Sequence, residues 1–180
     1  MYKLKGVIFS LRDVLVQSGT IDPYKLSETV NLLKFLISKG VKPVLVSNST
    51  WTITSSGSPS GESFQDYLSN AVGHELLFYQ GGKDIAYKQY AKAMRKVLDE
   101  NDWVASEVVY VGSTDYDMRA AINGKLLFLR AKWHADNSEY GFEFSSPKDL
   151  GRFLDCCCME LGDWFWGVED GNLRTFSIAP

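Results

Sequence analysis

The chain has 180 residues, of which 45% are hydrophobic and 23% charged, and this is the composition of an ordinary globular protein. The length favours a single domain and is sufficient to bury a sizeable core without disulfide staples. Collagen-like, intrinsically disordered and disulfide-scaffold classes are therefore excluded for the chain as a whole. The net charge of −3 argues against a general affinity for nucleic acid, so we expect no nucleic-acid partner. No stretch of 18 or more apolar residues is present, and we expect no membrane association.

Residue types that bind metals or take part in redox chemistry are few. Three cysteines stand side by side at 156–158, a spacing that forms neither a disulfide framework nor a Cys-x-x-Cys motif. His74 and His134 are far from them in the sequence, so a zinc site is not favoured. Residues 1–6 lead into an apolar run without a small-residue cleavage site, which indicates a first strand and not a signal peptide. We therefore expect a reduced protein located in the cytoplasm.

Short apolar runs alternate with segments of helical spacing along the whole chain. In chain order the pattern predicts a strand at 7–9, a helix at 24–39, a strand at 41–46, a helix at 62–72, a strand at 75–79, a helix at 83–100, a strand at 108–111, a helix at 115–122, a strand at 126–129 and a helix at 147–161. Residues 55–61 are all turn formers and predict a loop. The alternation predicts an α/β fold with a mainly parallel, five-stranded sheet. In such sheets ligands bind beyond the carboxyl ends of the strands.

Polar residues follow three of the predicted strands at the point where each strand ends. The first strand is followed by Ser10-Leu11-Arg12-Asp13-Val14-Leu15, and the second by Ser47-Asn48. The fourth strand leads into Gly112-Ser113-Thr114-Asp115-Tyr116-Asp117, with two alanines close behind at 120–121. These stretches, in this order, resemble the conserved motifs of the haloacid dehalogenase-like (HAD) superfamily of phosphohydrolases. The resemblance extends over residues 5–155 and implies a three-layer, Rossmann-like fold.

The family's third motif is a lysine placed some two dozen residues before the glycine of the fourth motif. Lys88 fits this spacing best, and Lys83 and Lys92 are the rivals. The second motif, an apolar strand that ends in Ser or Thr and is often followed by Asn, is matched by Ser47 and Asn48.

The departures from the family pattern bear most on function. The resemblance places Ser10 where the family has its nucleophilic aspartate and Arg12 where it has the acid/base aspartate. It places Ser113 where the family has a magnesium-binding aspartate, so that only Asp117 keeps a carboxylate of the metal site. The neighbouring Asp13 is out of register with the first motif, and Asp115 is out of register with the fourth.

These exchanges predict the loss of phosphatase chemistry. A neutral serine is a poor nucleophile without an adjacent base, and the loss of a positioned acid/base removes a further factor of about 10²–10⁴. Magnesium requires oxygen ligands, usually one or two carboxylates together with substrate phosphate, so we expect no cofactor. The opposing hypothesis is an active phosphohydrolase of unusual mechanism, in which Asp13 or Asp115 replaces the lost groups and Mg²⁺ is needed.

The residues that stand where the family has aspartates also suggest a binding function. A guanidinium group binds phosphate through two parallel hydrogen bonds, so Arg12 introduces an anion-binding group where the family has an acid. We expect a metal-free phosphate site formed by Ser10, Arg12, Ser47, Asn48, Lys88, Ser113 and Asp117. The alternative is that Arg12 pairs with Asp13 or Asp117 and closes a vacant site.

Two further features concern partners. The intervals between residues 16 and 41 and between 48 and 75 have no room for the cap domain that the family often carries, and the resemblance implies that such members act on large substrates or are covered by a partner. Residues 1–161 are expected to form the HAD-like domain, and Asp170-Gly171 predicts a hairpin within residues 162–180, which would serve as a linker if a further domain follows. Trp164, Phe165 and Trp166 make this hairpin a candidate surface for a protein partner.

The sequence therefore predicts a HAD-like domain that binds a phosphorylated small molecule or a protein partner. Altered HAD-like domains also occur in bacterial stress-response operons, and the sequence is compatible with that context. The exposed face predicted for the basic set Lys88, Lys92, Arg95 and Lys96 is expected to be solvated.

Overall fold

The computed structural model describes residues 3–16, 23–50, 52–53, 62–134 and 142–157. Its main sheet contains the strands β1 (Gly6–Ser10), β2 (Lys42–Ser47), β5 (Leu77–Gln80), β6 (Val108–Gly112), β7 (Leu127–Ala131) and β8 (Phe142–Phe144). The helices are α1 (Pro23–Ser38), α2 (Phe64–Val72), α3 (Ala91–Glu100), α4 (Asp115–Gly124) and α5 (Pro147–Cys157). A short ribbon of β3 (Thr52–Ile53) and β4 (Glu62–Ser63) lies apart from the sheet, and a 3₁₀ turn, η1 (Ala105–Glu107), precedes β6.

The strands of the main sheet are arranged in the order β5-β2-β1-β6-β7-β8, and every neighbouring pair is parallel. The predicted α/β class with a parallel sheet is therefore confirmed. The predicted number of five strands is wrong, because β8 adds a sixth beside β7. This strand has only three residues, too few for an alternating pattern to stand out in the sequence. It is tied to β7 by an ion pair of 2.6 Å between Arg130 Nη1 and Glu143 Oε1.

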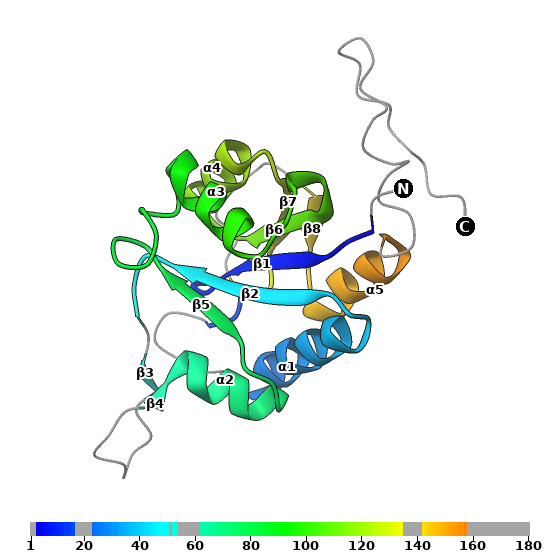
Figure 1. Cartoon of the computed structure of the whole chain (residues 1–180). Coiled ribbons are helices and arrows are strands. Elements are labelled where there is room, and N and C mark those ends of the chain that lie inside the picture. The colour runs from blue at the N-terminus through cyan, green and yellow to red at the C-terminus, as the bar shows by residue number, and fades with distance from the viewer. Residues whose placement is uncertain (1–2, 17–22, 51, 54–61, 135–141, 158–180) are drawn as a thin grey trace.

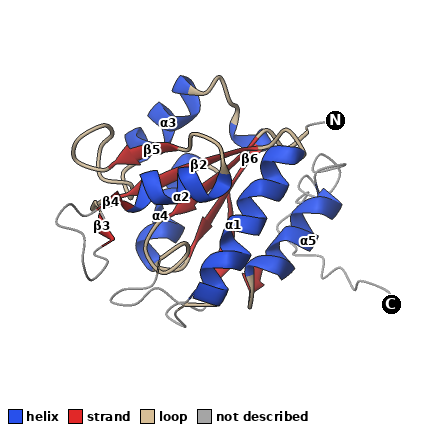
Figure 2. Ribbon diagram, turned by 90° about the horizontal axis from the view of Figure 1, so that it is seen from below, coloured by secondary structure: helices blue, strands red, loops and turns tan. Residues whose placement is uncertain are grey.

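Helices cover both faces of the sheet and give the molecule three layers. In Figure 1, α3 and α4 lie on one side of the sheet, and α1, α2 and α5 lie on the other. Figure 2, turned by 90°, shows α1 and α5 running side by side, in agreement with their direct contact. This arrangement is the three-layer, Rossmann-like architecture that the sequence predicted.

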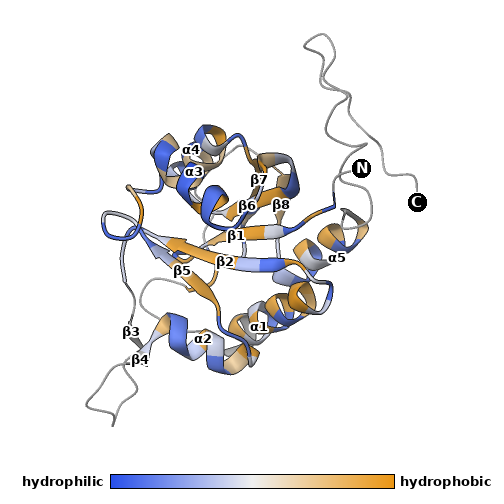
Figure 3. Ribbon diagram, in the orientation of Figure 1, coloured by the Kyte–Doolittle hydropathy of each residue, from blue (hydrophilic) through white to orange (hydrophobic). Residues whose placement is uncertain are grey.

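Alternate residues of each central strand point to opposite faces, so the sheet has two separate cores. Val7 and Phe9 of β1 belong to the core beneath α1 and α5, whereas Ile8 of the same strand belongs to the core beneath α3 and α4. The inner strands are almost uniformly apolar (Figure 3), as is typical of parallel strands buried on both faces. The sheet is therefore held on both sides, which fixes the positions of the side chains at its carboxyl edge.

The helix predicted at 83–100 is wrong over its first eight residues, because α3 begins only at Ala91. Residues 80–85 form a tight turn in which the backbone N–H groups of Asp84 and Ile85 both donate to the carbonyl of Gln80, at 2.9 and 3.2 Å. The Asp84 carboxylate in turn accepts the N–H of Gln80 at 2.9 Å. These hydrogen bonds close a turn at 80–85, and further along the N–H of Lys88 donates to the Asn48 side chain at 2.9 Å and not to the carbonyl of a preceding helical turn. Lys88 therefore lies in the loop between β5 and α3, and not on the predicted basic helix face.

Other predicted elements are found close to their expected bounds. Between β1 and β2 the described residues contain a turn at 11–16 and the helix α1, and between β2 and β5 they contain the β3–β4 ribbon and α2. The loop predicted at 55–61 lies outside the described residues. So does the predicted hairpin at 162–180, with Trp164, Phe165 and Trp166.

The last described helix, α5, presents its apolar residues to the core. Leu150 and Leu154 are fully buried, and Cys156 is exposed with a free thiol. No helix within the described ranges is long and apolar enough to cross a membrane.

The N-terminal end of β1 depends on the close approach of an indole ring. A Cβ atom built on Gly6 would overlap the six-membered ring of Trp103, which is buried beside the strand. We therefore expect Gly6→Ala to lower the free energy of unfolding by about 1–3 kcal/mol, because an extra carbon in a filled core forces its neighbours to move. The measurement is urea unfolding followed by far-UV circular dichroism.

The control is Gly151→Ala. Gly151 lies inside α5, and an added Cβ there would meet Leu32 Cδ1 at 3.4 Å, an ordinary contact. Because alanine favours a helix interior over glycine by about 0.5–1 kcal/mol, this variant should be neutral or more stable than the parent. Equal effects of the two substitutions would contradict the packing assigned to Trp103.

Candidate functional site

The carboxyl ends of three neighbouring strands bring the predicted serines together. Ser10 closes β1 and pairs in register with Val46 of β2, directly before Ser47, while Phe9 pairs with Val111 of β6. Ser10, Ser47 and Ser113 are all buried. The structure thus gathers at one sheet edge the residues that the sequence placed at the strand ends.

Lys88 connects these strands from the loop before α3. Its Nζ atom donates to Ser10 Oγ at 2.9 Å and to Asp117 Oδ1 at 2.5 Å. Both members of this ion pair are buried, with side-chain exposures of 8% for Lys88 and 0% for Asp117. The two rival lysines, Lys83 and Lys92, are exposed and make no such contact. Lys88 is therefore the lysine that reaches the strand ends.

The carboxylate of Asp117 is fully occupied by donors. Besides the Lys88 ammonium, its Oδ1 atom accepts the hydroxyl of Tyr110 at 3.0 Å. Its Oδ2 atom accepts the backbone N–H groups of Ser113 and Thr114, both at 3.1 Å, and the hydroxyl of Thr114 at 2.8 Å. A carboxylate offers about four lone-pair positions, so these five donors leave none for a further ligand.

The same contacts set the charge of the group. Burial by itself would raise the pKa of Asp117, but the ammonium of Lys88 and the hydrogen bonds from Lys88 and Thr114 hold that pKa below its ordinary value of 3.8. Burial, and then the negative charge of Asp117, raise the pKa of Tyr110 well above 10.0. At neutral pH Asp117 is therefore a carboxylate, ion-paired with Lys88, and Tyr110 is a neutral phenol.

An open cleft of about 560 Å³ lies beside this buried network. Its lining comes from the ends of β1, β2 and β6 and from the loop before α3, and consists of Arg12, Ser47, Asn48, Ser49, Tyr87, Lys88, Gln89, Tyr90, Thr114 and Tyr116. We call it the Arg12 cleft. The only charged residues among those listed are Arg12 and Lys88, and both are cations. Ser10, Ser113 and Asp117 do not line it, because they lie in the buried network.

Arg12 is the most accessible cation of the cleft, with 62% of its side chain exposed. Its Nε atom lies 3.4 Å from Asp13 Oδ2, and its guanidinium makes no hydrogen bond to another described residue. Asp13 sits in the left-handed region of backbone space (φ 57°) at the turn after β1. Of the two partners foreseen for Arg12, the structure provides Asp13 and not Asp117, and this ion pair leaves the cleft open. Asp115, the other out-of-register carboxylate, is exposed in the first turn of α4.

Asn48 holds the loop that carries Lys88. Its Oδ1 atom accepts the backbone N–H of Lys88 at 2.9 Å, and its Nδ2 atom donates to Gln89 Oε1 at 3.1 Å. A side chain on Gly81 would overlap Asn48 Oδ1, so glycine is required beside this contact. The amide that the sequence suggested as a ligand donor is thus engaged in positioning the loop.

Sequence analysis missed the tyrosines of the cleft. Tyr87 and Tyr90 flank Lys88 in the chain, and Tyr116 follows the fourth strand. The proximity of Tyr87 and Tyr90 to the third-motif lysine, and of Tyr116 to Asp117 in the fourth motif, was a signal. For Tyr87 and Tyr90 the prediction of a helix from residue 83 concealed it.

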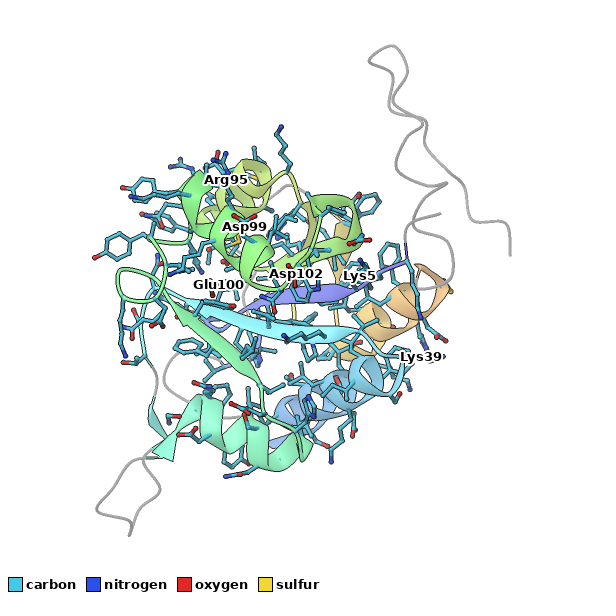
Figure 4. The ribbon with its side chains drawn as sticks, in the orientation of Figure 1. Lys5, Lys39, Arg95, Asp99, Glu100 and Asp102 are labelled. Carbon is cyan, nitrogen blue, oxygen red and sulfur yellow. The ribbon has the colours of Figure 1, made fainter. Side chains whose placement is uncertain are left out.

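The basic residues of α3 do not form a uniform patch. Lys92, Arg95 and Lys96 are exposed, but Lys96 pairs with Glu100 at 3.5 Å. Figure 4 shows Arg95 near Asp99, Glu100 and Asp102 at this end of the molecule, so the face carries both signs of charge.

Proteins similar to this chain are found among solved structures and not by sequence comparison. No protein-family model matches the chain, and no curated protein matches its sequence. Among solved structures, the cobalt-bound deoxy-D-mannose-octulosonate 8-phosphate phosphatase (YrbI) from Haemophilus influenzae aligns over 91% of this chain and 94% of its own, with 14% identity and a TM-score of 0.57. The chain has a haloacid dehalogenase-like fold.

Two further structures agree with this assignment. The 3-deoxy-D-manno-octulosonate 8-phosphate phosphatase from Moraxella catarrhalis, in complex with magnesium, phosphate and KDO, covers 84% of this chain and 85% of its own, with 11% identity and a TM-score of 0.55. A Legionella pneumophila protein assigned to HAD subfamily III A covers 88% and 85%, with 14% identity and a TM-score of 0.55. At these identities the similarity establishes the HAD-like fold of the chain.

The residues of this site can be compared with the ligands that the Mg²⁺ ion of such a phosphatase requires. Mg²⁺ prefers an octahedral set of oxygens that includes one or two carboxylates. Asp117 is the one carboxylate in the buried network, and its lone pairs are taken by five donors. Ser113 contributes a buried neutral hydroxyl, and within the described residues no group of three or more His, Cys, Asp or Glu side chains is placed to hold a metal. The described residues therefore do not fit a magnesium ion at this position.

The buried ion pair makes a first prediction for the site. Asp117→Asn should lower the free energy of unfolding by about 3–5 kcal/mol at pH 7, because it leaves the Lys88 ammonium buried without its counter-charge. Lys88→Met in the same background should recover part of this loss, since no buried charge then remains. Urea unfolding of the two single variants and the double variant measures the coupling. Strict additivity of the two losses would contradict the ion pair.

The pKa of Asp117 makes a second prediction. Because the folded pKa lies below the ordinary value of 3.8, the stability gained from the ionised carboxylate is complete above that value and is lost as the pH falls through the folded pKa. The difference in unfolding free energy between the parent and Asp117→Asn should therefore be constant from pH 7 to about pH 5 and shrink below pH 3.8. A difference that does not change between pH 7 and pH 2 would show that the charge of Asp117 contributes nothing.

Proposed function

We propose that this HAD-like protein is a metal-independent binding module for phosphorylated small molecules, without phosphatase chemistry. The observation that carries the proposal is the separation of a closed, buried network from the open Arg12 cleft beside it. Ser10, Lys88 and Asp117 satisfy one another in the network, whereas the cleft remains open. The module would thus keep the place where HAD-like phosphatases bind phosphate and use it without their reaction.

The charge of the cleft supports an anionic ligand. Its two charged lining residues are cations, and no carboxylate lines it. Both cations have an acidic partner, Lys88 in the buried Asp117 and Arg12 in Asp13 at 3.4 Å, but 62% of the Arg12 side chain is exposed, so Arg12 is the cation that a ligand would reach. A guanidinium whose planar fork is exposed matches two phosphate oxygens at once, and charge-assisted hydrogen bonds of this kind are about twice as strong as neutral ones.

Neutral donors around the cleft complement this cation. Ser47 contributes a hydroxyl group to the lining, and its Oγ accepts the backbone N–H of Ser49 at 3.2 Å, which leaves its own proton available for donation. The Thr114 hydroxyl also lines the cleft but already donates to Asp117. Phosphate oxygens accept from hydroxyl and guanidinium donors alike. A phosphorylated molecule would therefore meet donors on more than one side.

The arrangement argues against the aspartyl-phosphate reaction of the family. Lys88 Nζ donates a hydrogen bond to Ser10 Oγ and another to Asp117, so it is placed as a donor toward the serine and not as the base that would activate it. Asp13 is paired with Arg12, and Asp115 is exposed away from the cleft lining. The opposing hypothesis, an active phosphohydrolase, predicts release of phosphate from a phosphoester that is lost on mutation of Asp13, Asp115 or Asp117. A protein partner at Trp164, Phe165 and Trp166 stays a separate prediction.

Ligand-dependent thermal unfolding tests the proposal. The parent is heated with inorganic phosphate, sugar phosphates and nucleotides, each with Mg²⁺ and with EDTA. A ligand present at 100 times its Kd adds about 2.7 kcal/mol of stability, which is a readable shift in melting temperature. We expect a shift with at least one phosphorylated ligand, equal with Mg²⁺ and with EDTA, and we expect Arg12→Ala to abolish it.

Arg95→Ala is the matched control, because it removes an exposed arginine from α3 without touching the cleft. It should leave the shift unchanged. A shift that requires Mg²⁺ would contradict the metal-free site and favour the enzyme. The absence of any shift with every ligand would overturn the proposal.

A further inference from the structure

The mouth of the Arg12 cleft is unusually rich in exposed aromatic rings. Within the described residues, six large hydrophobic side chains are exposed, and three of them are tyrosines that line this cleft. Tyr87, Tyr90 and Tyr116 are 51%, 54% and 57% exposed. Single exposed rings are ordinary on a protein surface, but a cluster around a cleft indicates a binding surface.

The tyrosines come from two segments that are fastened to each other. Tyr87 and Tyr90 lie in the loop before α3, where the N–H of Tyr90 donates to the carbonyl of Tyr87 at 2.9 Å. Tyr116 lies in the first turn of α4, and Asn123 of the same helix donates to the carbonyl of Gln89 at 2.6 Å.

The loop is also held from the opposite side. Asn48 binds both the backbone of Lys88 and the side chain of Gln89. Because these contacts order the loop before any ligand arrives, little conformational entropy remains to be lost when a ring docks against it.

The three tyrosines and Arg12 offer a ligand different kinds of contact. A tyrosine ring offers a flat apolar face that stacks on planar aromatic groups, and such stacking is tolerant of the particular base. Arg12 offers a planar cationic fork for an anion. A sugar phosphate would engage Arg12 and leave the rings exposed, whereas a ligand with a phosphate and an aromatic base would cover both. The cleft, at about 560 Å³, lies within the range of small-molecule sites.

We infer that the ligand of the Arg12 cleft is a nucleoside monophosphate, with its phosphate on Arg12 and its base stacked on the ring of Tyr87, Tyr90 or Tyr116. The inference rests on the proposed function, because it assigns the ligand class of the same cleft. The base supplies affinity through its π face, so purine and pyrimidine nucleotides both bind.

Calorimetric titration with a matched pair of probes tests the inference. Adenosine 5′-monophosphate and ribose 5-phosphate present the same phosphate and sugar, and only the former carries a base. The parent should bind the nucleotide more tightly than the sugar phosphate. Alanine in place of at least one of the three tyrosines should lower the affinity for the nucleotide by about 5- to 150-fold, the range for loss of one base–aromatic stack. The affinity for ribose 5-phosphate should not change.

Phenylalanine variants are the matched controls. Tyr87→Phe, Tyr90→Phe and Tyr116→Phe keep the ring, so they should bind the nucleotide within about threefold of the parent if stacking provides the contact. Arg12→Ala should lower the affinity for both probes, and this result identifies the phosphate contact separately from the base contact. Unchanged thermal unfolding of each unliganded variant confirms that it is folded.

The possible failures are distinguishable. Equal affinity for the two probes, with no effect of any alanine substitution, would overturn the stacking inference and leave the phosphate module standing. Binding of neither probe, nor of uridine 5′-monophosphate, would overturn the nucleotide inference, and the broader ligand panel would then decide the phosphate module separately.

Discussion

The buried ion pair between Lys88 and Asp117 is the contact on which the site depends. It joins the loop before α3 to the start of α4, and through Ser10 it reaches the end of β1. A buried charge is costly unless it is paired and hydrogen-bonded, and here each partner supplies the other's counter-charge while Tyr110, Ser113 and Thr114 satisfy the remaining carboxylate lone pairs. The pair therefore fixes three segments that are distant in the sequence.

The hydrogen-bond network around Lys88 and Asp117 also separates the polar groups that hold the protein together from those that a ligand can reach. Asp117 serves at once as the counter-ion of Lys88 and as the third residue of the capping box at the start of α4. The capping box satisfies the backbone N–H groups of Thr114 and Asp117 inside the protein. Of the two cations that line the Arg12 cleft, Lys88 belongs to the buried network, whereas Arg12 is exposed to solvent. This division is the physical basis of the binding module that we propose.

The sheet keeps these groups in place. Its inner strands are buried on both faces, by α1 and α5 on one side and by α3 and α4 on the other, so the carboxyl edge cannot shift without disturbing two cores. The loop before α3 lacks regular structure, yet Asn48 and Asn123 fasten it from both sides. A rigid rim beside an exposed cation is well suited to a ligand that has both a flat ring and an anionic group.

The sequence by itself determined the α/β class, the parallel character of the sheet and the gathering of Ser10, Ser47 and Asp117 at one edge. These features follow from local patterns, because apolar runs define strands and the carboxyl ends of parallel strands meet. Tertiary structure alone decided that Lys88 stands in a loop, that Asp117 is saturated while Arg12 stays exposed, and that three tyrosines surround one cleft. The physical reason is that turn hydrogen bonds at residues 80–85 outweighed the helical spacing, and that burial and donor count depend on segments distant in sequence.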